Sequence, residues 1–333
     1  MATYYGTYGQ KVQYLASDPS DPQIGQVWYN STSATLKVRQ QVVTNAWASG
    51  GNLNNARYTL AGAGTQTAAL GFGGYIGGSG YIGNSESYNG TSWTATPSLN
   101  TGRGYLAGCG TQTAGLAFGG NPSGPVLAST ENWNGSSWTS TGSMNTARNK
   151  IAGAGLQTAA LAFGGQTPSN VLSNSESFNG TSWTAGNTLG TAKSALTGVG
   201  IQTAALAIGG ATGIPAAGTK TAAVESYNGT SWTSGTAIPT ATAALASSGT
   251  QTASLAFGGQ TGNPATTVGT TYLFNGTSWT SVTSLTTARN FLGSGNASPN
   301  SASLAFGGSA PSESNATEEW TGTVISSKTV TVS

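Results

Sequence analysis

Few residues of this chain could do chemistry, and their spacing favours internal ion pairs over catalysis. Only 6% of the 333 residues are charged, and histidine, the commonest general base and metal ligand, is absent. Cys109 is the single cysteine, so neither an internal disulfide nor a cysteine-based metal site is predicted. A cation nevertheless recurs along the chain, and a glutamate follows it 28 to 32 residues later in five places: Arg57 with Glu86, Arg103 with Glu131, Arg148 with Glu176, Lys193 with Glu225, and Arg289 with Glu318.

One copy of this pattern lacks both charges. Thr242 stands where the cation is expected, and Tyr272 stands where the glutamate is expected. A lone buried charge is costly, so paired groups should disappear together. The joint loss predicts that each cation faces the glutamate of its own unit; the alternative is that both are ordinary surface charges.

These charges belong to a repeat of 45 to 49 residues, which decides the fold before any local pattern does. Ten residues before each cation, or before Thr242, stands a tryptophan, and sixteen residues after the first five of those positions a Gly-Gly pair begins. The sixth Gly-Gly, at Gly307, follows Arg289 by eighteen residues. The tryptophans are Trp47, Trp93, Trp138, Trp183, Trp232 and Trp279.

Each unit contains four short segments with strand character. In the second unit they are residues 106–110, 115–118, 131–133 and 137–140. Asn134-Gly135 between the last two is typical of a two-residue type I′ hairpin turn, which needs positive φ at both positions. Four strands per unit, joined by tight turns, predict one blade of a β-propeller.

The units resemble the kelch repeat, in which an Arg, a Gly-Gly, a Glu-x-aromatic and an outer-strand Trp recur in that order. The first unit matches at Arg57, Gly73-Gly74, Glu86, Tyr88 and Trp93, and the resemblance covers roughly four fifths of the chain. It implies an all-β fold: a six-bladed β-propeller of kelch-like four-stranded blades, with a short N-terminal β extension. The fifth unit departs from the pattern, and the sixth lacks its own outer Trp.

The missing Trp is expected from the other end of the chain. Trp47 is in phase with the other outer strands, so a strand near residues 43–48 should complete the blade begun at Arg289 and close the ring. The alternative closing segment is residues 329–333. The predicted domains are an attachment segment over residues 1–42, with a small β element, and the propeller over residues 43–333.

The loops between second and third strands vary in length, and all should emerge on one face. Variable loops on a rigid scaffold commonly bind partners, although unconstrained drift would also explain the variation. The candidate binding residues are Tyr75, Ile76, Tyr81, Ile82, Pro122, Pro168, Ile214 and Pro264.

The N-terminal segment resembles a β element of bacteriophage tail-fibre and other virion proteins. The matching residues are Gly25, Trp28, Tyr29, Asn30 and the run 36–38. Trp28 and Tyr29 are therefore candidate attachment residues. The resemblance implies a virion structural protein, in the tail or associated with the capsid, that is made in the host cytoplasm without a signal peptide. Its expected partners are other virion proteins and a carbohydrate or protein of the host surface.

Two other classes remain as alternatives. Propellers carry enzymes, including carbohydrate-active enzymes and copper oxidases, but the Arg residues recur as structural positions and no His is present. An intracellular kelch-type adaptor would usually carry a further domain, and none is apparent. A net charge of +2 without a basic run argues against nucleic-acid binding, and no apolar segment of membrane-spanning length occurs. We therefore expect a non-enzymatic protein without metal, cofactor or membrane insertion.

Overall fold

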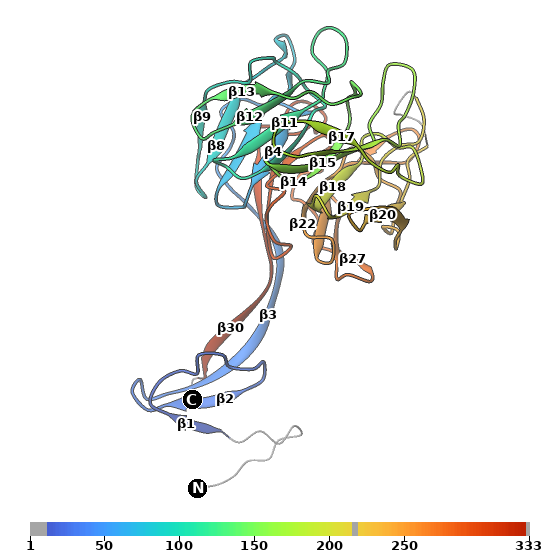
Figure 1. Ribbon diagram of the computed structural model, residues 1–333. Helices are drawn as coiled ribbons and strands as arrows, with labels where there is room; N and C mark the ends of the chain where they lie inside the picture. Colours follow the sequence, from blue (N-terminus) through green and yellow to red (C-terminus); the bar gives the residue numbers. More distant parts are fainter. Residues whose placement is uncertain (1–11, 215–218, 331–333) are drawn as a thin grey trace. The chain divides into compact units, whose positions relative to one another are not determined.

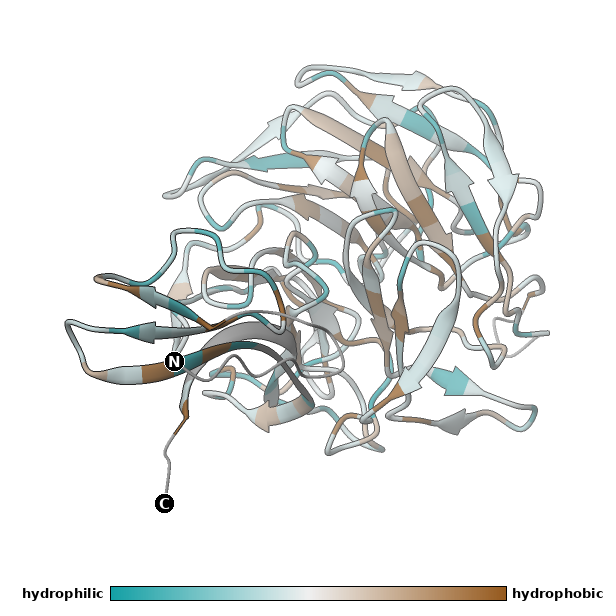
Figure 2. Cartoon of the chain, turned by 90° about the horizontal axis from the view of Figure 1, so that it is seen from below, coloured by the Kyte–Doolittle hydropathy of each residue, from teal (hydrophilic) through white to brown (hydrophobic). Residues whose placement is uncertain are grey.

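Every regular element of the protein is a β-strand in the computed structural model, which describes residues 12–214 and 219–330. No helix able to cross a bilayer occurs in these two ranges. Hydrophobic residues lie mainly in the strands, and many connecting loops are hydrophilic (Figure 2). The fold is a β-propeller, as the repeat predicts.

Five sheets of four antiparallel strands follow one another along the described chain. Each sheet uses its strands in chain order, so each repeat unit forms one sheet. In the second unit the strands are β10 (Ala107–Gly110), β11 (Gly115–Phe118), β12 (Thr130–Trp133) and β13 (Trp138–Thr141), within a residue or two of the predicted bounds. The other four sheets are β4 (Ala61–Gly64), β5 (Ala69–Phe72), β8 (Ser85–Tyr88) and β9 (Trp93–Thr96); β14 (Ala152–Leu156), β15 (Ala159–Phe163), β16 (Ser175–Phe178) and β17 (Trp183–Ala185); β18 (Thr197–Ile201), β19 (Ala204–Ile208), β20 (Val224–Tyr227) and β21 (Trp232–Ser234); and β22 (Ala246–Gly249), β23 (Ser254–Phe257), β26 (Thr271–Phe274) and β27 (Trp279–Val282).

A sixth sheet combines the two ends of the chain. Its order is β28 (Gly293–Ser294), β29 (Ala302–Phe306), β30 (Thr317–Val330) and β3 (Thr35–Ser49), followed by β2 (Val27–Asn30) and β1 (Gln13–Leu15). Trp47 therefore lies in the strand next to β30, with its ring 5.4 Å from that of Trp320, and the Gly50 amide donates to the Thr317 carbonyl at 2.9 Å. Residues 329–330 belong to β30 itself, and residues 331–333 lie outside the described part.

The chain divides into two compact units, Ala46–Trp320 and the residues on either side. The first of these is the propeller. The second contains β1, β2 and the adjoining parts of β3 and β30, so described residues from Thr321 onward group with the N-terminal segment, although a propeller over residues 43–333 was expected. The reason is that β30 continues well past Trp320 as the neighbour of β3.

The inner strands form a closed circle. β4, β10, β14, β18, β22 and β28 each contact the next, and β28 contacts β4. Figure 1 labels β4, β14, β18 and β22 of these strands within the propeller. The residue two positions before each inner strand has φ between 50° and 59°, and its amide donates to the carbonyl of its equivalent in the preceding unit at 2.7–2.9 Å. These six residues are Thr59, Tyr105, Lys150, Ala195, Ala244 and Phe291, and we call them the axial ring.

A second circle of hydrogen bonds explains the Gly-Gly pairs. The second glycine of each unit donates to the carbonyl at the cation position of the next unit, as Gly120 does to Arg148 at 3.0 Å and Gly308 does to Arg57 at 2.9 Å. A Cβ at Gly119, whose φ is +65°, would lie 2.8 Å from the Arg148 carbonyl oxygen. Only glycine permits this approach.

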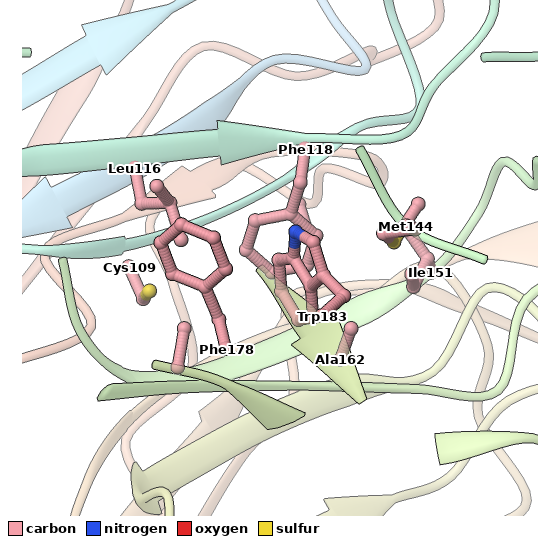
Figure 3. Close-up of a cluster of buried hydrophobic side chains, with 10 residues drawn as sticks. Cys109, Leu116, Phe118, Met144, Ile151, Ala162, Phe178 and Trp183 are labelled. Atoms are coloured by element: carbon pink, nitrogen blue, oxygen red, sulfur yellow. The ribbon is translucent and has the colours of Figure 1, made fainter. Parts of the chain in front are cut away.

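The outer tryptophans pack between neighbouring sheets. Trp183 lies against Phe178 of its own sheet and Phe118 of the preceding one, at ring distances of 5.0 Å (Figure 3). Its indole N–H donates to the Thr130 hydroxyl at 2.9 Å. Trp47 repeats this arrangement across the chain ends, with Phe257 at 4.9 Å and Thr271 at 3.0 Å.

The recurring glutamine in the turn between first and second strands joins sheets as well. The Gln157 side-chain amide donates to the carbonyls of Gly115 and Trp133 in the preceding sheet, at 2.9 and 2.5 Å. Four other units repeat the bond pair, through Gln66, Gln112, Gln202 and Gln251.

The predicted two-residue type I′ turns are wrong in detail. Tyr88 pairs with Trp93, which leaves four residues in the loop, and of the Asn-Gly pair only Gly90 has positive φ. The Asn89 side-chain oxygen accepts from the amides of Thr91 and Ser92, both at 2.9 Å. The asparagine thus caps the turn with its side chain, and this favours a longer loop than its backbone alone would.

Candidate functional site

The cation and glutamate of each unit are paired within their own sheet, as predicted. The Arg57–Glu86, Arg148–Glu176, Lys193–Glu225 and Arg289–Glu318 ion pairs span 2.8–3.1 Å, and Arg103 pairs with Glu131. All ten side chains are buried. Burial lowers the pKa of each cation, and the adjacent glutamate partly offsets the effect.

Each glutamate has a second task, which accounts for the unit that lacks it. The other oxygen of Glu131 accepts from the backbone amide of Asn100 at 2.7 Å, in the segment that enters the unit. The fifth unit has Pro239 at the position of Asn100, and proline has no amide hydrogen. The fifth unit has therefore lost the cation, the carboxylate and the amide donor together. The charges of the other units stabilise their sheets.

The loop face carries a group of aromatic side chains. Tyr75 and Tyr81 lie in the short hairpin β6 (Tyr75–Ile76) and β7 (Gly80–Tyr81), with their rings 5.2 Å apart. Tyr58 lies 5.4 Å from Tyr75, Tyr105 lies 6.4 Å from Tyr81, and Phe291 lies 5.2 Å from Tyr105. These five half-buried rings form one continuous chain, which we call the aromatic patch.

The patch is held from both sides. Asn121 donates to the Tyr81 hydroxyl at 2.9 Å, and the Gly77 amide donates to the Glu313 carboxylate at 2.9 Å. Burial, and then the neighbouring Tyr75, raises the pKa of Tyr58, and burial also raises the pKa of Tyr105. These tyrosines are therefore neutral hydroxyl groups at ordinary pH.

Phe291 and Tyr105 belong to both the patch and the axial ring, so the patch ends at the propeller axis. Lys150, the next ring member, places its amine 5.4 Å from the centre of the Tyr105 ring. Burial lowers the pKa of this amine. Neither an ion pair nor a hydrogen bond of the Lys150 amine occurs among the described residues.

An axial cavity of about 120 Å³ lies at this end of the inner strands. Asn296 also lines it, from the turn that is two residues longer in the sixth unit, and donates to the Gly108 carbonyl at 2.8 Å. The other lining segments are the axial ring and the start of each inner strand, residues 59–62, 105–108, 150–153, 195–198, 244–246 and 291–294. Most of the lining residues are glycine, alanine, leucine or isoleucine.

The other candidate binding residues occupy separate loops. Ile76 and Ile82 accompany Tyr75 and Tyr81 in the hairpin, and all four are half-buried. Ile214, Pro168 and Pro264 are exposed, and Pro122 is half-buried, each in the loop of a different unit. The structure thus brings the residues around the hairpin together and places these four in separate loops.

The N-terminal candidates lie in the smaller unit. Trp28 is fully buried there, and its indole donates to Asp18 at 3.0 Å, whereas the half-buried Tyr29 stacks on Tyr14 at 5.0 Å. Asp18 also accepts from Asn30 at 2.7 Å and from Lys37 at 2.6 Å. Of the two candidates, only Tyr29 offers a ring surface to a partner.

A second cavity, of about 340 Å³, lies at the other ends of the inner strands. Leu156 and Ile201, which are 50% and 54% exposed, line it at the position where three other units have threonine. Among the described residues, no cluster of His, Cys, Asp and Glu suited to a metal ion occurs.

Comparison with known proteins supports the architecture. No protein-family model and no curated protein matches the chain. Many solved structures match the chain, and among them that of YjhT superimposes with a TM-score of 0.64 at 13% sequence identity, covering 85% of this chain and 99% of that one. At this identity the likeness shows a shared propeller fold.

Proposed function

We propose that this protein is a non-enzymatic structural protein of a bacteriophage particle, which displays its propeller for contact with the host surface or with neighbouring virion subunits. The aromatic patch is the observation that carries the contact role. It is a continuous chain of half-buried rings on the face where the loops differ most between units. Aromatic clusters of this kind are typical of recognition surfaces.

Two further features support the proposal. The kelch-like repeat and the N-terminal Gly25, Trp28 and Tyr29 pattern resemble phage structural proteins. The recurring arginines, which an enzyme acting on an anionic substrate would direct into its site, are instead buried in ion pairs within each sheet.

Particle composition tests the proposal. Particles from a culture that produces this chain should be banded in a density gradient, analysed by mass spectrometry and labelled with gold-conjugated antibody. We expect the chain to band with infectious particles and the antibody to label intact ones. Recovery of the chain only from the particle-free lysate would overturn the virion assignment.

A further inference from the structure

The amine of Lys150 stands apart from the other cations that the structure describes in the propeller. The four arginines at the recurring cation position and Lys193 each pair with a glutamate, and Lys220 donates to the Gly262 carbonyl at 2.6 Å. Lys150 is half-buried and lines the axial cavity, and the only described contact of its amine is the face of Tyr105. A positive charge in such a position lacks an anion.

We propose that the axial cavity binds a carboxylate group of the partner, with Lys150 as its counter-ion and the aromatic patch beneath the rest of the ligand. This inference rests on the proposed function in one respect, the role of this face as the contact surface. The inference does not depend on whether the chain is part of a phage particle.

The size of the cavity selects the group that enters. A volume of about 120 Å³ is ample for a carboxylate but smaller than the roughly 150 Å³ cavity that takes up benzene, so the carboxylate enters and the body of a larger ligand stays outside. The single ammonium group matches a single negative charge. Thr59, which is 3% exposed, also lines the cavity, and its hydroxyl oxygen has no hydrogen-bond partner.

Charge along the patch fixes the direction of the ligand. Glu313 lies at the hairpin end, bonded to Gly77 and close enough to Tyr58 to raise the pKa of that phenol. Lys150 lies at the axial end. An anionic group is therefore repelled from the hairpin and attracted to the axis, while the ligand body covers the tyrosine rings between them.

The experiment is a titration of the full chain with benzoate, which combines a carboxylate with a flat apolar body. The chain has six lysines, so reductive ¹³C-dimethylation, which keeps their charge, gives few NMR signals to resolve. We expect benzoate to shift the Lys150 signal saturably and to leave that of Lys220 unchanged. Neutral benzamide should bind at least tenfold more weakly, and added salt should weaken benzoate binding.

Variants provide the second arm, read by saturation transfer to the benzoate protons. Lys150→Gln should weaken benzoate binding at least tenfold, because it removes one charge-assisted hydrogen bond. The affinities of Lys150→Arg and of the matched control Lys220→Gln should stay within about threefold of the parent, because both keep the charge at position 150. Equal binding of benzamide, an unshifted Lys150 signal, or full binding by a folded Lys150→Gln protein would each overturn the carboxylate site. The lysine signals of the unsubstituted chain decide the matter even where a variant fails to fold.

Titration of glucuronate and of N-acetylglycine in the same way distinguishes an acidic sugar from a peptide terminus as the source of the carboxylate. If the chain is found on particles but does not bind benzoate, the carboxylate site is wrong and the virion assignment stands. If the chain binds benzoate but is absent from particles, the virion assignment is wrong and the carboxylate site stands.

Discussion

Each buried arginine of the propeller depends on its glutamate. We expect Glu131→Gln to lower the free energy of unfolding by about 3–5 kcal/mol, because Arg103 stays buried without a counter-ion. The double variant Arg103→Thr/Glu131→Tyr copies the fifth unit and should lose less than the glutamine variant. Denaturant unfolding measures the coupling between the two sites. Costs that simply add would contradict the pairing.

Side-chain roles could be predicted where the repeat supplies its own comparison. The ion pairs were predicted because one unit lost both partners, Thr242 and Tyr272 replacing them. The role of Lys150 could not be predicted. The six units share a left-handed backbone and a backbone hydrogen bond at this position, but their side chains differ, so the sequence shows no repeat there. Tyr75 and Tyr81 were predicted as candidate binding residues of one loop, but the sequence did not show that Tyr58, Tyr105 and Phe291 extend their cluster to the axis.

At the scale of the element, the Gly-Gly pairs set how closely neighbouring sheets approach. We expect Gly119→Ala to destabilise the protein by about 1–3 kcal/mol, since φ is +65° and the added Cβ would meet the Arg148 carbonyl. Gly124→Ala is the matched control, because a Cβ there meets nothing within 4 Å. Thermal unfolding of both proteins tests this, and equal melting temperatures would refute the steric argument.

The hydrogen-bonded element around Asp18 gives a pH prediction. Bonds from Asn30, and then from Lys37 and Trp28, lower the pKa of Asp18 to about 2. Because its pKa in the folded state is below the unfolded value of about 3.9, its contribution to stability is present above pH 4 and is lost as the pH falls through about 2. The NMR signal of the Trp28 indole N–H should move in that range. Asp18→Asn should abolish the movement, and a midpoint near pH 4 in the unsubstituted protein would contradict it.

The period of the repeat predicted the strand positions to within a residue or two, but it did not predict the geometry of the turns. Asn-Gly suggested a two-residue loop, whereas the Asn89 side chain caps a four-residue one. The conserved spacing of glutamine in the first turn was visible in the chain. Its bonds to the preceding sheet were not, because they join the side-chain amide to backbone carbonyls 24 and 42 residues away in the sequence.

At the scale of the whole molecule, closure of the ring depends on a strand from the start of the chain. We expect Trp47→Ala to cost about 3–5 kcal/mol, as Trp183→Ala should, because both indoles pack on a phenylalanine of the preceding sheet and donate to a hydroxyl. Equilibrium unfolding in denaturant compares the two variants. A Trp47→Ala protein as stable as the parent would show that its strand does not close the ring in solution.

We propose that the loop face, through the aromatic patch, makes the contact of a displayed virion protein. The most direct test is the adsorption of phage particles carrying Tyr75→Ala/Tyr81→Ala to host cells, beside particles carrying Pro168→Ala on a different loop. We expect particles with the tyrosine variant to assemble and to adsorb at least tenfold more slowly than the parent, and particles with the proline variant to adsorb at the parent rate. The reason is that a few aromatic residues commonly carry most of the binding energy of an interface, whereas most other positions contribute little. Unchanged adsorption by assembled particles that carry the tyrosine variant would contradict the claim.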